Sequence, residues 1–317
     1  MKLSLVVPCF NEEDVVYNFY KEVKNVIESK TDDFEFVFVN DGSRDKTLEV
    51  LRAIYKVADN VKVVSFSRNF GKEAAIYAGL SNACGEYTCV IDADLQQRPE
   101  VVLQMMEILD SEPETDCVAA YQEERRESKT LTFFKDSFYK LINKVSEVEF
   151  YPGASDFRLM RRPMVDAVLE MSEYHRFSKG LFSFVGFNTK FIPYVVQERA
   201  GGTSKWSFVK LFKYAIEGIV GYTTTPLRIA TFAGVGFMAA ALVYLVIALI
   251  AGAIVHSISS AVAIITLILF VGGLNFLFIG IVGEYLARTY MQVKNRPVYI
   301  VKELLDSKEK KESDSRE

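Results

Sequence analysis

A long stretch without charged residues constrains the fold of this chain more than any other feature of its sequence. Between Ile229 and Gly283 there is no Asp, Glu, Lys or Arg. One membrane-spanning helix needs only about 20 consecutive apolar residues, so the stretch is long enough for two. The polar segment HSISS at 256–260 interrupts it. We therefore expect two transmembrane helices, over about 229–255 and 261–285. A pair of buried core helices is the alternative.

Positive charges on both sides of this membrane region (229–287) indicate its orientation. The turn at 256–260 carries no Lys or Arg, whereas both flanks carry several. Basic residues are enriched in the loops that stay in the cytoplasm. Both ends of the hairpin, and with them both termini of the chain, should therefore lie in the cytoplasm. The flanking basic residues are Lys205, Lys210, Lys213, Arg228, Arg288, Lys294, Arg296 and Lys302.

The segments before and after the membrane region have their own patterns. Residues 205–228 set lysines against apolar residues at helical spacing, which predicts a basic amphipathic helix in the membrane interface or, alternatively, a core helix. Residues 129–145 show a second amphipathic pattern. No secretory signal precedes the first apolar run, so 1–204 should form a cytosolic domain. Residues 288–317 should form a cytosolic tail, and its polar end, 307–317, should be disordered.

Charge and cysteine content exclude some classes of function. The formal net charge of -4 gives no basic surface of the kind that binds nucleic acid. The four cysteines, at 9, 84, 89 and 117, include no CxxC pair. We therefore expect reduced core cysteines rather than disulfides or a metal site.

The first 120 residues alternate between two kinds of pattern. Runs rich in β-branched and aromatic residues predict strands, and runs of helical period between them predict helices. This alternation is typical of an α/β fold, in which helices cover both faces of a mostly parallel sheet. The predicted strands are 3–8, 34–40, 61–67, 87–93 and 117–121, and the predicted helices are 12–29, 46–58 and 72–84.

Each of the first four predicted strands runs into polar residues. The sequences at these points are PCFNEE (8–13), NDGSRD (40–45), SRNFGKE (67–73) and DADLQQ (92–97). Parallel α/β sheets bind ligands beyond the carboxyl ends of their strands, so these loops should converge on one site. No GxGxxG follows the first strand, which argues against dinucleotide binding.

Two of the polar residues, Asp92 and Asp94, are separated only by Ala93. On a turn after a strand both carboxylates can approach one cation, and this would relieve their repulsion. Magnesium usually takes one or two protein carboxylates together with phosphate oxygens of the substrate. The pair therefore suits a metal shared with a nucleoside diphosphate, although an Asp-x-Asp triplet alone is a weak signal.

The motifs together identify a family resemblance. VVPCFNEE, VNDGSRDKT, SRNFGKEAAIYAGL and VIDADLQQRPE resemble family 2 glycosyltransferases, which have the GT-A fold (Rossmann-like, with a mostly parallel sheet). RRES (125–128), GASDFRLM (153–160) and ERAGGTSKW (198–206), followed by two spans, are similar to the polyprenyl-phosphate glycosyltransferases. That subgroup includes bactoprenol glucosyltransferases and dolichol-phosphate mannose synthases. The resemblance covers about 3–302.

The resemblance implies a site for a nucleotide sugar. Asp41 is implied to hold the base or the ribose; alternatively it caps the following helix. Asp94 is implied to bind Mg²⁺ or Mn²⁺ directly, and Asp92 to contact sugar hydroxyls or the metal through water. Gln97 departs from the family pattern, which has Asp there. The full implied nucleotide-sugar set is Pro8, Phe10, Asn11, Glu12, Asp41, Asp92, Ala93, Asp94, Gln96, Arg199, Ser204 and Lys205.

The resemblance also implies how sugar is transferred. Asp156 matches the position proposed as the catalytic base, but a phosphate acceptor is largely a dianion at neutral pH and needs orientation more than deprotonation. We therefore favour Asp156 as an orienting residue, with base catalysis or a turn-capping role as alternatives. Arg199, Ser204 and Lys205 suit the diphosphate leaving group. The acceptor phosphate is assigned to Arg125, Arg126 and Arg158, with Lys179 as a weaker candidate; a solvated charged surface is the alternative for the first two.

The leading hypothesis is an inverting, metal-dependent transfer of a hexose to a polyprenyl phosphate at the cytoplasmic face of the inner (plasma) membrane. By resemblance the donor is UDP-glucose, the acceptor is undecaprenyl phosphate, and the product serves envelope polymer glycosylation. GDP-mannose or a UDP-N-acetylhexosamine are alternative donors. A processive polysaccharide synthase and a non-catalytic nucleotide-sugar-binding membrane protein are rival hypotheses. The resemblance also implies a homo-oligomer, with a tetramer as the expected state.

Overall fold

The computed structural model describes residues 1–122, 153–171, 176–195 and 260–307, with isolated residues between them at 143, 151, 173–174, 227, 230, 232, 234–237, 239–240 and 243. The chain divides into two compact units. One comprises Met1–Tyr214 together with Pro297–Glu317, and the other comprises Ala215–Arg296. The two units are described separately below.

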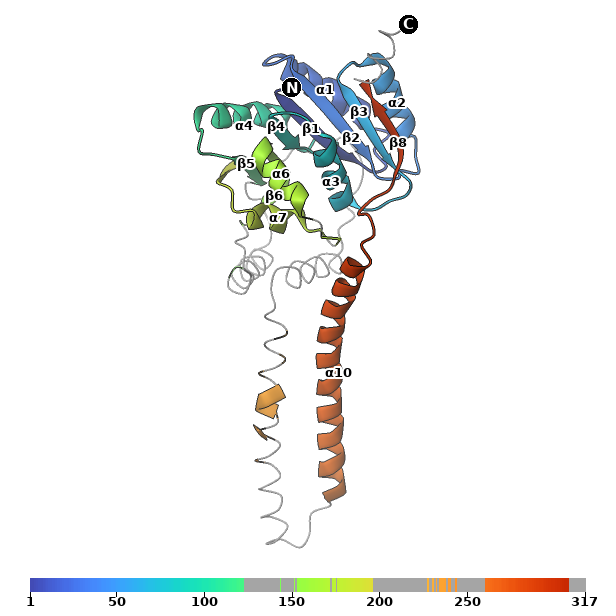
Figure 1. Cartoon of the computed structure of the whole chain (residues 1–317), viewed down its shortest axis with the longest axis vertical. Helices are drawn as coiled ribbons and strands as arrows, with labels where there is room; N and C mark the ends of the chain where they lie inside the picture. Colours follow the sequence, from blue (N-terminus) through green and yellow to red (C-terminus); the bar gives the residue numbers. More distant parts are fainter. Residues whose placement is uncertain are drawn as a thin grey trace. The chain divides into compact units, whose positions relative to one another are not determined.

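The first unit is built on a mixed β-sheet with the strand order β7-β5-β6-β4-β1-β2-β3-β8 (Figure 1). Strands β4, β1, β2 and β3 are mutually parallel, whereas β6 runs antiparallel to β4 and β8 runs antiparallel to β3. The expected α/β fold with a mostly parallel sheet is therefore confirmed. The strands are β1 Leu3–Cys9, β2 Phe34–Asn40, β3 Val61–Phe66, β4 Tyr87–Val90, β5 Cys117–Gln122, β6 Ala154–Arg161, β7 Thr189–Tyr194 and β8 Val301–Asp306.

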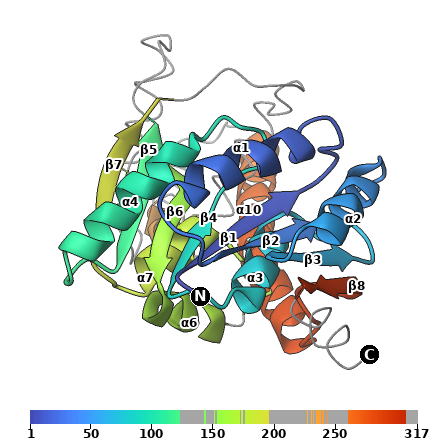
Figure 2. The same ribbon diagram turned by 90° about the horizontal axis from the view of Figure 1, so that it is seen from above.

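Helices cover both faces of this sheet (Figure 2). Alternate residues of β1 point to opposite faces: Leu5 and Val7 join a core with α1, α2 and α4, and Val6 joins a core with α3, α6 and α7. Burial on both faces explains why the central strands read as continuous apolar runs. The helices are α1 Val16–Glu28, α2 Thr47–Val57, α3 Lys72–Asn82, α4 Pro99–Ser111, α6 Arg162–Glu170 and α7 Ser178–Phe184.

Helix α3 packs unusually close to the sheet. A Cβ atom at Gly79 would lie 2.1 Å from Cγ1 of Val6, far inside van der Waals contact. The buried face of α3 consists largely of small residues, Ala74, Ala75 and Ala78 among them. This close approach fixes the position of the first turn of α3, where Lys72 and Glu73 lie.

The five strands predicted from the sequence are present, but β4 is shorter than expected. It ends at Val90 rather than at 93, because the chain turns there into the DADLQQ loop, in which Leu95 has a left-handed φ of 59°. Strands β6, β7 and β8 and helices α4, α6 and α7 were not predicted. Their patterns are short or half-exposed and so carry weaker periodicity than the central strands.

Strand β8 lies within the segment that the sequence analysis assigned to a tail. It pairs with β3 along Lys62–Phe66. Two ion pairs accompany the pairing: Arg52 with Glu303 at 2.5 Å and Lys62 with Asp306 at 2.9 Å. Part of the presumed tail is therefore an edge strand of the mixed sheet, and it protects the otherwise open edge of β3.

In the second unit the described residues form one long apolar helix, α10 (Ser260–Val293). Its segment Phe270–Val293 is long and apolar enough to cross a membrane, and no other helix among the described residues is. The helix continues beyond 285, where the sequence analysis placed its end. Most of the first expected span (229–255), and nearly all of the interfacial helix (205–228), lie outside the described residues. The two-helix hairpin therefore stays a prediction.

Candidate active site

Four polar loops meet at the carboxyl edge of the parallel strands, as the sequence predicted. The register pairs Cys9 of β1 with Asn40 of β2, and Asn40 with Ser65 of β3. Val6 of β1 pairs with Val90 of β4. The loops that follow these strand ends are therefore neighbours in space, and each of them contains one of the quoted motifs.

The loops after β1 and β2 are tied together by side chains. The Asn11 backbone N–H donates to Oγ of Ser43 at 3.0 Å, and the Arg44 N–H donates to Oδ1 of Asn11 at 2.9 Å. The Glu12 N–H donates to Oγ1 of Thr47 at 2.8 Å. Asn11 adopts a left-handed φ of 56°, a conformation that Asn tolerates better than most residues. The amide of Asn11 thus fixes the shape of this part of the edge.

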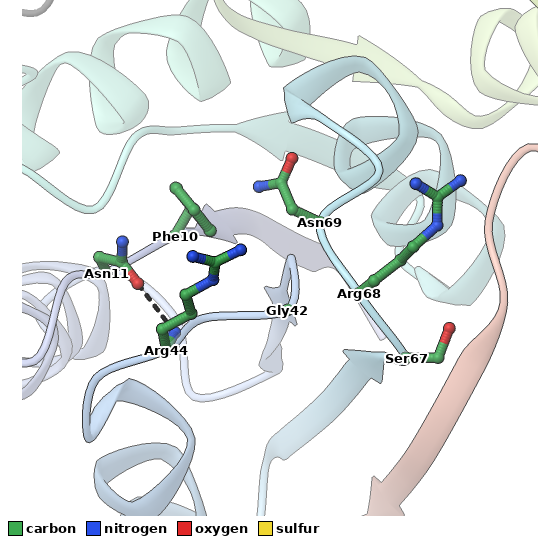
Figure 3. Close-up of a pocket in the computed structure, with 7 residues that line it drawn as sticks. All are labelled: Phe10, Asn11, Gly42, Arg44, Ser67, Arg68 and Asn69. Carbon is green, nitrogen blue, oxygen red and sulfur yellow. Dashed lines mark hydrogen bonds between the residues drawn. The ribbon is translucent and has the colours of Figure 1, made fainter.

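A pocket of about 640 Å³ opens between these loops and the loop after β3 (Figure 3). Phe10 is 39% exposed there and offers an aromatic face. Arg44 and Arg68 also line the pocket, and the sequence reasoning did not predict the positive charge that they add. Pro8 and Glu12 are half-buried beside the pocket and do not line it. The lining residues are Phe10, Asn11, Gly42, Arg44, Ser67, Arg68 and Asn69.

Gly42 permits the close contact between two walls of this pocket. It has a left-handed φ of 62°, and a Cβ atom there would lie 2.3 Å from the carbonyl carbon of Arg68 and 2.5 Å from the nitrogen of Asn69. Both are backbone atoms, which cannot rotate away as a flexible side chain could. Only glycine fits this position.

Asp41 binds the loop that precedes α3. Its carboxylate accepts hydrogen bonds from the Phe70 N–H at 2.6 Å, the Gly71 N–H at 3.0 Å and Nδ2 of Asn69 at 2.9 Å. Burial raises the pKa of Asp41, and the backbone donors partly oppose that shift. Asp41 does not cap α2, where Asp45 instead accepts from the Thr47 N–H. Its assignment to the base or ribose therefore stays a prediction, beside a clear role in loop structure.

The DADLQQ loop arranges its two aspartates differently. Oδ1 of Asp94 accepts from the Gln96 N–H at 3.1 Å, which closes a tight turn. Asp92 is held by Gln97: its N–H donates to Oε1 of Gln97 at 2.9 Å, and its Oδ2 accepts from Nε2 of Gln97 at 3.1 Å. Ala93 is buried in the core, so only its backbone faces the edge. Gln97, where the family pattern lapses, is thus the residue that orients Asp92.

Lys72 brings together the two aspartates from distant parts of the chain. Its ammonium lies 2.7 Å from Oδ1 of Asp92 and 3.1 Å from Oδ2 of Asp156. Asp156 reaches this point because β6 runs antiparallel beside β4, with Arg158 paired to Val90, so the start of β6 lies beside the end of β4. The sequence analysis named both aspartates and missed the lysine between them.

The charges around Asp156 set its protonation state. Burial alone would raise the pKa of Asp156, but Lys72, then Lys179 and Arg158, lower it to about 2. Glu73 differs: burial, with the Asp156 charge, raises its pKa to about 7 although it accepts hydrogen bonds from the N–H and Oγ of Ser178. Asp156 is therefore a stable anion at neutral pH, whereas Glu73, with a pKa of about 7, changes its protonation state close to neutral pH.

Arg158 lies in the interior. It is 4% exposed, its guanidinium stacks 3.9 Å from the ring centre of Phe182, and its Nη2 donates to the Ser155 carbonyl at 2.9 Å. This burial argues against direct contact with an acceptor phosphate and makes Arg158 a counter-charge for Asp156. The predicted residues Arg125, Arg126, Arg199, Ser204 and Lys205 lie outside the described residues.

The side chains at this edge of the sheet can be compared with the ligands that a divalent cation needs. No group of three or more His, Cys, Asp or Glu side chains with metal-binding geometry occurs among the described residues. The carboxylate of Asp92 contacts Lys72 and Gln97, and that of Asp94 accepts a hydrogen bond from the Gln96 N–H, so the choice of Asp94 as direct ligand stays a prediction. One protein carboxylate completed by diphosphate oxygens and water suits Mg²⁺ or Mn²⁺.

Comparisons with known proteins agree with the motifs. The sequence model of the family described as Glycosyl transferase family 2 matches residues 4–169. A prophage bactoprenol glucosyl transferase homolog of Escherichia coli (strain K12) is 39% identical over 307 residues, covering 95% of this chain and 99% of that protein. The bactoprenol glucosyl transferase of Shigella phage SfV is 38% identical over 307 residues, covering 95% and 98%. A structure of Mycobacterium tuberculosis glucosyl-3-phosphoglycerate synthase with Mn²⁺, UDP-glucose and phosphoglyceric acid is 19% identical, with a TM-score of 0.45 over 69% of this chain and 77% of that one.

Proposed function

This chain belongs to glycosyltransferase family 2, and from that premise we propose that it transfers glucose from UDP-glucose to undecaprenyl phosphate. The observation that carries the proposal is the extent of the similarity. Relatives named bactoprenol glucosyl transferases match 95% of this chain, well beyond the 4–169 segment of the family itself. The product would be a lipid-linked sugar for envelope polymer glycosylation.

The pocket of Figure 3 is where we place the nucleotide. Phe10 offers a face on which a uracil ring can stack, and Arg44 beside it adds positive charge for ribose or phosphate oxygens. The Arg68 side chain extends away from them, with its guanidinium over the ring of Phe70. Asn11 and Gly42 keep the walls in position. The contacts of Pro8, Glu12 and Gln96 with the donor, like those of Arg199, Ser204 and Lys205 with the diphosphate, remain part of the proposal.

Farther along the carboxyl edge of the sheet, the DADLQQ loop after β4 would meet the sugar and the leaving group. Asp94 would hold Mg²⁺ or Mn²⁺, which when bound neutralises charge on the departing diphosphate. Asp92, kept in place by Gln97, faces the sugar hydroxyls. Attack by the acceptor phosphate from the opposite side of the anomeric carbon would invert its configuration.

The state of Asp156 supports an orienting role over base catalysis. A carboxylate with a pKa of about 2 is a weak base, and a phosphate acceptor already carries its negative charge at neutral pH. Asp156 would therefore bind a hydroxyl of the sugar or fix the acceptor. Arg125 and Arg126 stay as proposed contacts of the acceptor phosphate, and Lys179 replaces the buried Arg158 in that group.

A lipid acceptor explains the membrane region. Its phosphate lies at headgroup depth, where a catalytic domain anchored by membrane helices can reach it. We propose a multi-pass protein of the inner membrane with both termini and the catalytic domain in the cytoplasm, and a homo-oligomer, expected to be a tetramer. Support comes from the helix Phe270–Val293 and from the charge pattern of the flanks.

The test is a transfer assay with membranes that contain the full chain. We expect label from radioactive UDP-glucose to become soluble in organic solvent when undecaprenyl phosphate and Mg²⁺ or Mn²⁺ are added, and to stay in the aqueous phase with Asp94→Asn. Parallel reactions with GDP-mannose and UDP-N-acetylglucosamine test the donor. Absence of lipid-linked label from every donor, with intact thermal stabilisation by a nucleotide sugar, would favour a non-catalytic binding protein.

A further inference from the structure

Lys72 has contacts that the proposed reaction has not yet used. It is the first residue of α3, whose position is fixed by the close packing of Gly79 on Val6. Its ammonium touches Asp92, on the loop after β4, and Asp156, at the start of β6. One side chain therefore links three parts of the chain that are far apart in sequence.

Both carboxylates depend on this link for their orientation. Two carboxylates that share one ammonium would repel each other if it were removed. Gln97 holds only one side of Asp92. Asp156 is 16% exposed, and its Oδ1 has no hydrogen-bond partner among the described residues. Lys72 is therefore the donor that keeps the half-buried Asp156 carboxylate in place.

We propose that Lys72 is a positioning residue for the transfer reaction: its ammonium holds Asp92 toward the donor sugar and Asp156 toward the bond that is formed. This inference rests on the proposed function. In this proposal Lys72 acts on the reaction through its two carboxylate partners. A direct contact between Lys72 and the diphosphate is the competing explanation.

A double-mutant cycle on kcat separates the two explanations. If Lys72 acts through Asp156, Lys72→Met should lower kcat about 10- to 100-fold, since small misplacement of reacting groups has effects of this size. The KM for UDP-glucose should change little, because the nucleotide pocket is built from other residues. In the Asp156→Asn background, Lys72→Met should lower kcat by a smaller factor than in the wild type, because only its hold on Asp92 is then left to lose. Lys72→Arg should recover part of the loss, since a guanidinium can also join two carboxylates.

Lys62 provides a matched control. It forms a lysine–aspartate ion pair on the same sheet, with Asp306 at 2.9 Å and only 12% of its side chain exposed, away from the strand-end loops. Lys62→Met should leave kcat unchanged. If the double variant loses kcat by the product of the two single-variant factors, Lys72 and Asp156 act independently, and the positioning role is overturned. A rise in KM after Lys72→Met without a fall in kcat would overturn it as well.

A second readout keeps this test separate from the proposed function. If the wild-type chain transfers no sugar to lipid, the proposed function fails, and the same four proteins are compared by thermal unfolding in detergent. A bridge between Lys72 and Asp156 predicts that Asp156→Asn lowers the unfolding midpoint less in the Lys72→Met background than in the wild type. Equal shifts in both backgrounds would mean that the bridge does not form, and the inference would fall.

Discussion

The substitution Gly42→Ala tests whether the pocket of Figure 3 depends on a backbone contact that only glycine allows. Two effects are expected. The first is the strain of a left-handed φ of 62° in a residue with a Cβ, about 1–2 kcal/mol. The second is overlap with the backbone of Arg68 and Asn69 at 2.3 and 2.5 Å. Overpacking of this kind typically costs about 1–3 kcal/mol.

Gly186 separates the two effects. It has a similar left-handed φ of 71°, but a Cβ atom there would meet nothing within 4 Å. Gly186→Ala should therefore show the strain alone, and Gly42→Ala the strain and the overlap. The difference between the two variants isolates the overlap of about 1–3 kcal/mol, which corresponds to a lower unfolding midpoint by roughly 2–12 °C for a domain of this size.

The assay is thermal unfolding of the full chain in detergent, with and without UDP. Gly42→Ala should also reduce the stabilisation by UDP, because Asp41 holds the loop at 69–71 and prevents the pocket wall from moving aside. Gly186→Ala should keep the full response to UDP. If both variants unfold at the same temperature and respond equally to UDP, the reasoning from the Gly42 contact is wrong.

Three further predictions follow from the site and the sheet. Gln97→Leu, which preserves much of the volume but removes both hydrogen bonds to Asp92, should lower kcat by roughly 10-fold or more at saturating donor; Gln104→Leu, at an exposed position of α4, is the control, and equal kcat values would contradict the role of Gln97. Because Glu73 has a folded-state pKa raised to about 7, the folded chain binds a proton there more tightly than the unfolded chain, so the stability it contributes at low pH is lost as pH rises from about 4.3 to about 7. The unfolding midpoint of the wild type should therefore fall over this pH range more than that of Glu73→Gln, and parallel curves would refute the shift. Leu305→Asp, on the side of β8 that packs against the core, should lower the midpoint, whereas Leu304→Asp, at a position 48% exposed, should not; equal effects would show that β8 does not occupy this register.

Sequence reasoning succeeded where one strong pattern determined the structure. The central strands are buried on both faces, so their apolar runs predicted β1 to β4 directly. The motif loops could be placed because parallel strands end at one edge. Asp92 and Asp156 were both named, although the sequence gives no sign that these residues, 64 positions apart, share a contact with one lysine.

The missed residues depend on register and packing, which a single sequence does not display. Lys72 was read as part of a helix start, and its role appears only once β6 is known to lie antiparallel beside β4. Gln97 was noted as a departure from the family pattern, and its position beside Asp92 depends on the left-handed turn at Leu95. Arg158 was assigned to the acceptor phosphate, but it is buried and its guanidinium stacks on the ring of Phe182. Strand β8 was missed because its apolar residues, Val301, Leu304 and Leu305, do not alternate and lie among charged residues.

Strand β8 also bears on how the protein is made. Its partner β3 ends at Phe66, and β8 begins about 235 residues later, after the long apolar helix α10 has been synthesised. At typical translation rates the interval is roughly 10–50 s. During that time the edge of β3 has no partner from this strand, and an open sheet edge invites pairing with other chains. Completion of the sheet on the β3 side therefore waits until the segment after α10 has been synthesised.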